Sequence, residues 1–228
     1  MAKHGKKYLA IKQTAPKDIM ALDKAIEFLK ANPAAKFDES LELAMNLGVD
    51  ASKTEQTVRG TVGLPHGTGK MVRIIVFATG SAAEAAKQAG AEQVGFEDLI
   101  EKVKAGWTEF DVAIATTEAM KEVRKLGKVL GPRGLMPNPK TGTVADDTAA
   151  AVQQSKAGKV EFRMDKNGNV GVAFGKRSFD VNKLVENAES IIAAIRAEKP
   201  LGVKGAFIRK CCVTTTMGVG IRVNVTDE

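Results

Sequence analysis

The chain has 228 residues, of which 44% are hydrophobic and 27% charged, a balance typical of a folded globular protein and not of a disordered one. Its formal net charge of +7 is compatible with a polyanionic partner, and its two adjacent cysteines form neither a disulfide framework nor a spaced metal motif. No apolar run has the length of a membrane span, and no signal-peptide core follows the basic start, so we expect a cytoplasmic protein.

The first 67 residues predict one amphipathic helix and one half-buried strand. Four apolar residues recur at helical spacing: Ile19, Leu22, Ile26 and Leu29. We expect Asp18 to cap this helix. Residues 41–47 alternate between apolar and polar side chains, which indicates a strand with one buried face, and we place Phe37 at the beginning of that strand.

Residues 72–158 alternate between strands and helices. Val72–Ala78 and Asp111–Ala115 are nearly continuous apolar runs, as expected for strands that are buried on both faces. Helices are predicted over residues 81–88, 97–105, 117–126 and 146–158, and a short strand over residues 91–94. Ser81 is expected to cap the first helix, and Asp146 or Asp147 the last. This alternation predicts a parallel sheet with helices on both sides.

The last third predicts more strands and one long helix. Strands are expected over residues 159–164 and 169–174, and the Asn167-Gly168 pair between them predicts a β-hairpin. An apolar stripe predicts a helix over residues 181–195. Two closing strands are expected over residues 205–213 and 219–225.

The two flanks of the chain lack a second layer when each is taken alone. We therefore expect residues 1–67 and 159–228 to form one discontinuous α+β two-layer sandwich that contains both termini. Residues 68–158 would form an inserted α/β domain, because insertion is tolerated where two connections lie close together. The expected hinges are Gly67–Lys70 and Gly158–Lys159.

A proline-rich loop, residues 130–143 (LGPRGLMPNPKTGT), contains three prolines and three glycines. Proline fixes φ and pushes the preceding residue out of the helical region, so this loop is predicted to be stiff and ordered. The basic residues of the surrounding stretch are Lys121, Arg124, Lys125, Lys128, Arg133 and Lys140. The prolines either only shape a crossover or present Arg133 and Lys140 to RNA or another partner.

No catalytic or cofactor motif is recognisable. In VGLPHGTGK, residues 62–70, five residues separate Gly63 from Gly69-Lys70 where a phosphate-binding loop needs four, and Met71 replaces the required hydroxyl. His4 and His66 are too far apart in sequence for a metal motif or a triad. We expect no enzyme, no metal and no cofactor. The alternatives are a nucleotide-dependent small-molecule enzyme that uses the α/β domain, and a general basic RNA chaperone.

Five segments, in order, carry a resemblance to a known family. They are KHGKKY (residues 3–8), AKFDES (35–40), VRGTVGLPHGTGK (58–70), GKVLGPRGLMPNPKTGTV (127–144) and VTTTMG (213–218). Together they resemble the family of the bacterial large-subunit ribosomal protein that is first in the large-subunit numbering. The resemblance covers essentially the whole chain, and it implies the discontinuous first domain and a Rossmann-like second domain.

The function that this resemblance implies is structural and regulatory RNA binding. A member of the family binds large-subunit rRNA at the mobile stalk and assists release of deacylated tRNA from the exit site. It also represses translation of its own operon by binding its mRNA. The implied partners are therefore large-subunit rRNA, exit-site tRNA, own-operon mRNA and other ribosomal components, with no membrane. The implied location is the large subunit in the cytoplasm.

The resemblance also implies a set of RNA-binding residues: Glu27, Lys36, Phe37, Ser40, Arg163, Lys166, Lys210, Thr216, Met217 and Gly218. Threonine and serine hydroxyls suit ribose 2′-OH groups, methionine offers a flexible apolar face, and glycine lets the backbone approach RNA. The lysines and the arginine are expected to contact phosphates. Taken without the resemblance, the composition of residues 213–220 favours a tight turn between strands, and each charged residue is typical of a solvated surface.

Overall fold

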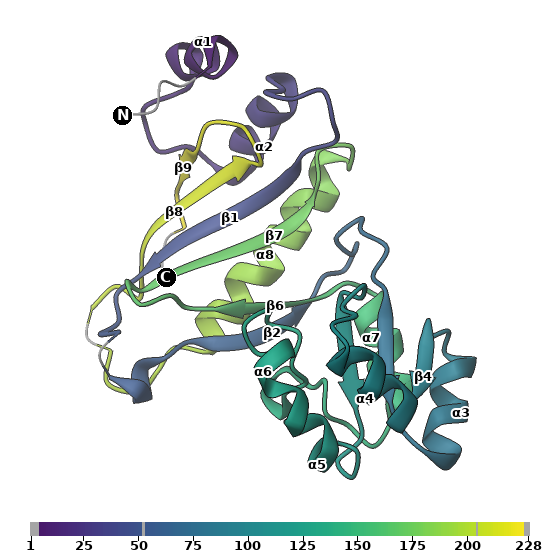
Figure 1. Cartoon of the computed structure of the whole chain (residues 1–228). Coiled ribbons are helices and arrows are strands. Elements are labelled where there is room, and N and C mark those ends of the chain that lie inside the picture. The colour runs from purple at the N-terminus through teal and green to yellow at the C-terminus, as the bar shows by residue number, and fades with distance from the viewer. Residues whose placement is uncertain (1–4, 52, 204, 226–228) are drawn as a thin grey trace. The chain divides into compact units, whose positions relative to one another are not determined.

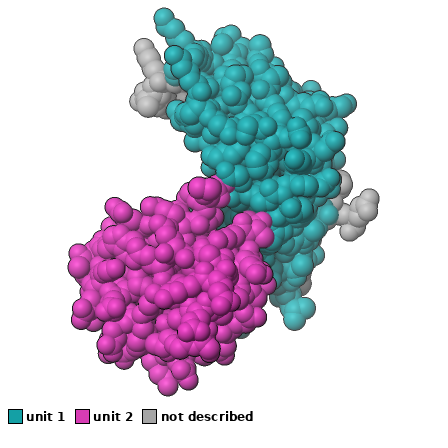
Figure 2. Space-filling view, turned by 90° about the vertical axis from the view of Figure 1, so that its right-hand side faces the viewer, with its two compact units in different colours: residues 1–69, 160–228 teal, residues 70–159 magenta. Residues whose placement is uncertain are grey.

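The structure is a computed structural model that describes residues 5–51, 53–203 and 205–225. His4 lies outside the described residues, as do the side chains of Thr54 and Lys140. The chain divides into two compact units (Figures 1 and 2). Unit 1 comprises residues 1–69 and 160–228, and unit 2 comprises residues 70–159.

Unit 1 contains both ends of the chain and most of the strands. Its helical elements are α1 (Lys6–Thr14), α2 (Leu22–Ala31), α8 (Val181–Ala197) and the 3-10 turn η1 (Thr54–Gln56). Its strands are β1 (Ser40–Leu47), β2 (Arg59–Gly63), β6 (Lys159–Arg163), β7 (Asn169–Lys176), β8 (Ile208–Thr215) and β9 (Ile221–Val223). A four-stranded antiparallel sheet has the order β7-β1-β8-β9, and β2 pairs with β6 in a separate two-stranded sheet.

The four-stranded sheet buries one face and leaves the other uncovered. Leu41, Leu43 and Met45 are buried in a core that also contains residues of α2 and α8, and Figure 1 shows both helices on the same side of the sheet. The residues between them in β1 point the other way, as the alternation of the sequence predicts. We call this other side the open face; it is formed by Glu42, Ala44, Asn46, Gly171, Ala173, Lys210, Cys212, Thr214 and Arg222.

The beginning of the chain departs from the prediction. The prediction that Asp18 caps the first helix is wrong, because α2 begins only at Leu22, after the N-cap Ala21. Met20 is extended instead: its N–H donates to the Arg222 carbonyl at 3.0 Å, and its carbonyl accepts from Asn224 N–H at 2.9 Å. Pairing with β9 thus overrides the helical spacing of Ile19, whose side chain is 64% exposed. The sequence did not predict α1, none of whose side chains is buried.

The hairpin and the strand position of Phe37 were also wrong. The turn at residues 165–168 forms, and the Asp165 side chain accepts the N–H groups of Asn167 and Asn169 at 2.8 and 2.7 Å. However, β7 pairs with β1, whereas β6 pairs with β2, so the two flanking strands belong to different sheets. Phe37 lies in a bend before β1. The preceding helix ends at Ala31, and residues 32–39 are used to reach the sheet.

Unit 2 contains a parallel sheet of the order β4-β3-β5. Its strands are β3 (Ile74–Phe77), β4 (Gln93–Gly95) and β5 (Val112–Ala115). Its helical elements are α3 (Gly80–Gln88), α4 (Glu97–Lys104), α5 (Met120–Val123), η2 (Arg124–Leu126), α6 (Gly127–Leu130), η3 (Pro139–Thr141) and α7 (Thr148–Lys156). One core contains Ile75 and residues of α4 to α6, and the other contains Val76 and residues of α3 and α7. Helical layers therefore cover both faces, as the buried strands predict.

Several helix boundaries in unit 2 differ from those predicted. The helix expected over residues 117–126 is broken into α5, η2 and α6. Asp147 caps α7 by accepting the N–H of Ala150 at 3.0 Å, whereas Asp146 accepts from the N–H and hydroxyl of Thr117. Ser81 is not a cap, because α3 already begins at Gly80, whose φ of 61° needs a residue without a Cβ atom.

The proline-rich loop is ordered from within. Thr143 Oγ1 accepts the N–H of Asn138 at 2.8 Å, and Thr141 Oγ1 donates to the Asn138 carbonyl at 2.9 Å. Leu135 and Met136, the apolar pair, pack against the core beside α4 to α6. The inner side of the loop therefore has a packing role. Arg133 is exposed, and its guanidinium donates to the hydroxyl of Thr108.

Candidate RNA interface

The centre of the candidate interface is a tight turn at the end of β8. The N–H of Gly218 donates to the Thr215 carbonyl at 3.0 Å, which closes a four-residue turn with Thr216 and Met217 at its tip. A Cβ atom on Gly218 would come within 2.1 Å of Thr215 Oγ1, so a side chain at this position requires the turn to move. The glycine is needed for packing inside the protein as well as for any approach of RNA.

A fully buried acidic residue, Glu39, fixes this turn to the start of β1. Glu39 Oε1 accepts from Thr215 Oγ1 at 3.3 Å and from Met217 N–H at 3.1 Å, and Oε2 accepts from Ala34 N–H at 3.3 Å. A buried carboxyl group is stable only when hydrogen bonds replace its water, and these donors do so. Glu39 therefore holds the loop before β1 and the turn after β8 in one arrangement.

Thr216 is placed directly against Ser40. The Ser40 N–H donates to Thr216 Oγ1 at 3.1 Å, and Thr216 Oγ1 lies 3.3 Å from the Ser40 carbonyl, to which it donates. A hydroxyl has one donor hydrogen and two acceptor lone pairs, so Thr216 retains one lone pair. Ser40 in turn accepts from Lys176 Nζ at 2.8 Å, which places a cation beside the two hydroxyls.

Two large apolar side chains are exposed at this end of the sheet. Phe37 is 54% exposed and Met217 is 58% exposed. Phe37 lies two residues before Glu39, and the N–H of Met217 is bonded to Glu39, so the same carboxyl group anchors both segments. Exposed apolar side chains on a braced, polar surface are typical of a binding site.

Arg177 contributes an unsatisfied donor next to this cluster. Its backbone N–H donates to the Glu39 carbonyl at 2.8 Å, which positions it at the end of β7. Its Nε atom is buried and, among the described residues, has no hydrogen-bond partner. Since buried donors are normally paired, this atom is a candidate for satisfaction by a bound anion or water.

The structure brings only part of the predicted site together. Ser40, Thr216, Met217 and Gly218 share one cluster, and Phe37 lies on the adjoining segment. Lys36 and Glu27 are exposed on the segment before Phe37 and on α2, respectively.

The other predicted cations do not join this cluster. Lys210 is opposite Asn46, six residues along β1 from Ser40, which corresponds to roughly 20 Å at about 3.4 Å per residue. Arg163 ends β6, and Lys166 is exposed in the turn before β7. Any ligand that contacts all of these residues must therefore extend along the strands.

Sequence analysis missed Glu39, Lys176 and Arg177 as members of the cluster. A signal for Glu39 was present, because residue 39 has the same parity as the buried residues Leu41 and Leu43 of β1. An acidic residue in the buried phase of a strand needs internal donors and thus indicates a polar network. No comparable signal identifies Lys176 or Arg177, whose positions follow from the pairing of β7 with β1.

The described residues contain no group of three or more His, Cys, Asp or Glu side chains arranged to hold a metal ion. Within the same ranges, no helix combines the length and apolar character of a membrane span.

Comparison with known proteins places the chain in a class. Residues 29–219 match the model of the ribosomal protein L1p/L10e family, and the chain belongs to this family. Two similar proteins are both named large ribosomal subunit protein uL1. The one from Fervidobacterium nodosum is 53% identical over 227 residues, which cover 99% of this chain and 97% of the relative. The one from Kosmotoga olearia is 50% identical over 225 residues, covering 98% and 97%.

Family membership confirms the general function. The chain is a ribosomal protein, a structural and non-enzymatic constituent of the ribosome in the cytoplasm, and its partners are rRNA and other ribosomal components. The alternative of a nucleotide-dependent enzyme is thereby set aside, as was expected from the lack of a catalytic motif.

Proposed function

We propose that this protein belongs to the large subunit and binds rRNA of the mobile stalk through the end of its four-stranded sheet. The name of the two relatives supports the assignment to the large subunit. The observation that carries the binding site is the Thr216 turn, which is held rigid by buried Glu39 while Met217 remains exposed. A surface that is already ordered loses little conformational entropy when RNA binds.

The hydrogen-bond pattern supports a role for each polar group in this proposal. Because the Thr216 hydroxyl donates to Ser40, its free lone pair accepts from a ribose 2′-OH. Met217 and Phe37 cover sugar or base with apolar surface. Lys36, Lys176 and Arg177 offer positive charge to the phosphates beside them. Glu27, an exposed acceptor on α2, bonds a further 2′-OH.

Residues 1–67 and 159–228 form the rRNA-binding domain in this proposal, and residues 68–158 form the inserted domain. Arg163, Lys166 and Lys210 extend the phosphate contacts along the first domain. In the same proposal the protein assists tRNA release from the exit site, and it represses its own operon by binding mRNA that presents the same RNA structure.

The test is a comparison of two substitutions on stalk rRNA and on unrelated RNA. Thr216→Val keeps the shape but removes the hydroxyl, which leaves the ribose 2′-OH unpaired at a cost of about 1–3 kcal/mol on stalk rRNA alone. Lys166→Ala is the matched control. It removes one phosphate contact, so it weakens both RNAs similarly and lowers the log–log salt slope by about 0.7–0.9. Equal losses from both substitutions on both RNAs would contradict the proposed site.

A further inference from the structure

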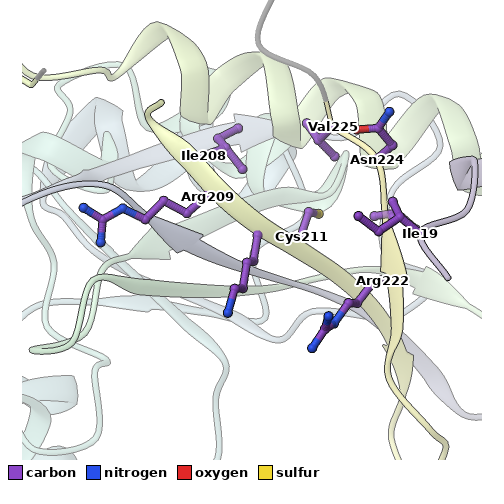
Figure 3. A pocket seen from close by; sticks show the side chains of 9 residues that line it. Ile19, Ile208, Arg209, Cys211, Arg222, Asn224 and Val225 are labelled. Atoms are coloured by element: carbon purple, nitrogen blue, oxygen red, sulfur yellow. The ribbon is translucent and has the colours of Figure 1, made fainter. Parts of the chain in front are cut away.

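A groove opens at the edge of the four-stranded sheet, where β8 continues past the end of β9 (Figure 3). It has a volume of about 240 Å³ and is lined by nine residues, three of which are positively charged and none negatively charged. The charged residues are Arg209, Lys210 and Arg222. The groove lies near the beginning of β8, whereas the Thr216 turn follows the end of the same strand.

The groove results from the pairing of the strands. β9 pairs with Cys211–Val213, so the first residues of β8 are left without β9 beside them. A register shift opposite Asn46 and Leu47 places Arg209 at a bulge, and both Arg209 and Lys210 are exposed. Gly48 lies close to the chain before this bulge, because a Cβ atom there would come within 2.4 Å of the Ala206 carbonyl oxygen and 3.2 Å of Arg209 Nε.

The three cations are available to a ligand. None of them makes an ion pair or a side-chain hydrogen bond with the described parts of the chain. Figure 3 shows Arg209 and Arg222 pointing away from Cys211 and Val225, which line the other side of the groove. The groove thus combines an apolar wall with a positively charged rim, and Asn224 adds an amide group to it.

A continuous surface connects the groove with the Thr216 turn. Lys210, Cys212 and Thr214 follow one another on the open face of β8. Their neighbours on this face include Glu42, which lies opposite Thr214, Ala44, which lies opposite Cys212, and Gly171, which lies opposite Ala44. Ala44 and Gly171 are too small to obstruct a ligand. An RNA strand bound at Thr216 can therefore follow β8 to the groove over roughly 20 Å.

We propose that this groove binds one unpaired nucleotide of the RNA that the Thr216 turn recognises, an inference that rests on the proposed function. Arg209, Lys210 and Arg222 take the phosphates, and the apolar wall with Asn224 takes the base and its polar edge. The volume supports a single nucleotide, because it is below the range of about 300–1,000 Å³ typical of pockets for larger ligands.

The experiment uses the full chain and a uridine hexamer as the probe. Hexamer binding is followed by the amide NMR signals of the ¹⁵N-labelled protein and by alkylation of Cys212, which is half-buried on the open face. We expect signal shifts at Arg209, Cys211 and Asn224, and protection of Cys212. Arg209→Gln with Arg222→Gln should weaken the hexamer about tenfold and lower its salt slope by about 1.4, or about 0.7 per lost phosphate contact. Lys102→Gln with Lys104→Gln, which removes two exposed positive charges from α4, is the matched control and should leave hexamer binding to the groove unchanged.

Two results distinguish this inference from the proposed function. If stalk rRNA binds in a Thr216-dependent manner but the hexamer shifts no groove signal, the groove is not a nucleotide site and the proposed function stands. Shifts confined to the Thr216 turn, or caused equally by an acidic peptide of the same charge, also overturn the inference. If the unsubstituted protein binds neither stalk rRNA nor the hexamer, both the groove inference and the proposed function are refuted.

Discussion

At the scale of single residues, Asp111 shows how one carboxylate stabilises the start of two strands. Lys70 Nζ lies 2.6 Å from Asp111 Oδ1, and Arg73 N–H donates to Oδ2 at 3.1 Å. The hydrogen bond from Lys70, followed by those from Arg73, lowers the pKa of Asp111 from 3.8 to about 2. A lowered pKa means that the stabilisation is complete above pH 3.8 and is lost as the pH falls toward 2.

We therefore expect Asp111→Asn to destabilise the protein near neutral pH and to have little effect near pH 2. The loss should be about 1 kcal/mol or less, because Lys70 and Arg73 are 63% and 49% exposed. Denaturant titrations across this pH range measure it. Glu122→Gln, which removes the charge from the exposed Glu122–Lys125 pair, is the control. A constant difference between Asp111→Asn and the unsubstituted protein at all pH values would contradict the assignment.

At the scale of elements, the segment that leads out of unit 1 is hydrogen-bonded to α8. Asn187 is fully buried; its Oδ1 accepts His66 N–H at 3.1 Å, and its Nδ2 donates to the carbonyls of Gly67 and Phe174 at 3.0 and 2.8 Å. His66 Nε2 also lies 2.6 Å from Glu186 Oε2. One side chain thus joins α8, the end of β7 and the segment that was expected to act as a hinge.

Replacing Asn187 with alanine should destabilise unit 1 by at least about 2 kcal/mol, since each buried group left unpaired costs about 1–3 kcal/mol. Urea denaturation measures the loss, and hydrogen exchange should show faster exchange at the His66 amide. Ser190→Ala, which removes only an exposed bond to the Glu186 carbonyl on the same helix, is the control. Normal stability of Asn187→Ala would mean that the hinge segment is held by other contacts.

Some elements were predictable from sequence and others were not, for physical reasons. The strict alternation in β1 and the long apolar stripe of α8 identify buried faces directly. In contrast, α1 buries no side chain and gives no hydrophobic pattern. Met20 is extended because β9 supplies backbone partners from 203 residues later in the chain, which local spacing cannot reveal. Likewise, Thr216 and Gly218 were nominated by resemblance. The parity of residue 39 indicates a buried polar network, but the identity of the Glu39 partners follows only from the pairing of β1 with β8.

At the scale of the whole molecule, the candidate interface lies entirely in unit 1. We expect a protein in which residues 1–67 are joined to 159–228 by a short linker to fold and to retain most of the affinity for stalk rRNA. Circular dichroism and a binding titration measure the two properties, with the full chain as the control. A folded variant that loses affinity by orders of magnitude would show that unit 2 supplies contacts to the RNA.

The proline-rich loop lies in unit 2, outside the candidate interface, and needs a different test. Arg133→Ala with Lys140→Ala should leave affinity for isolated rRNA nearly unchanged, and under the proposed function it should slow tRNA release from the exit site of assembled ribosomes. Thr108→Val is the matched control, because it removes the partner of Arg133 but keeps the charge. Unchanged release in a folded double variant would limit the loop to its packing role.

The bond between Ser40 and Thr216 also has a consequence for the time course of synthesis. These residues are 176 positions apart, and the interface does not exist until both have left the translating ribosome. A partly synthesised chain carries Phe37 and Lys36 but not the turn that completes the surface. We therefore expect nascent chains to be unable to capture rRNA or their own message, so that only finished molecules compete for RNA.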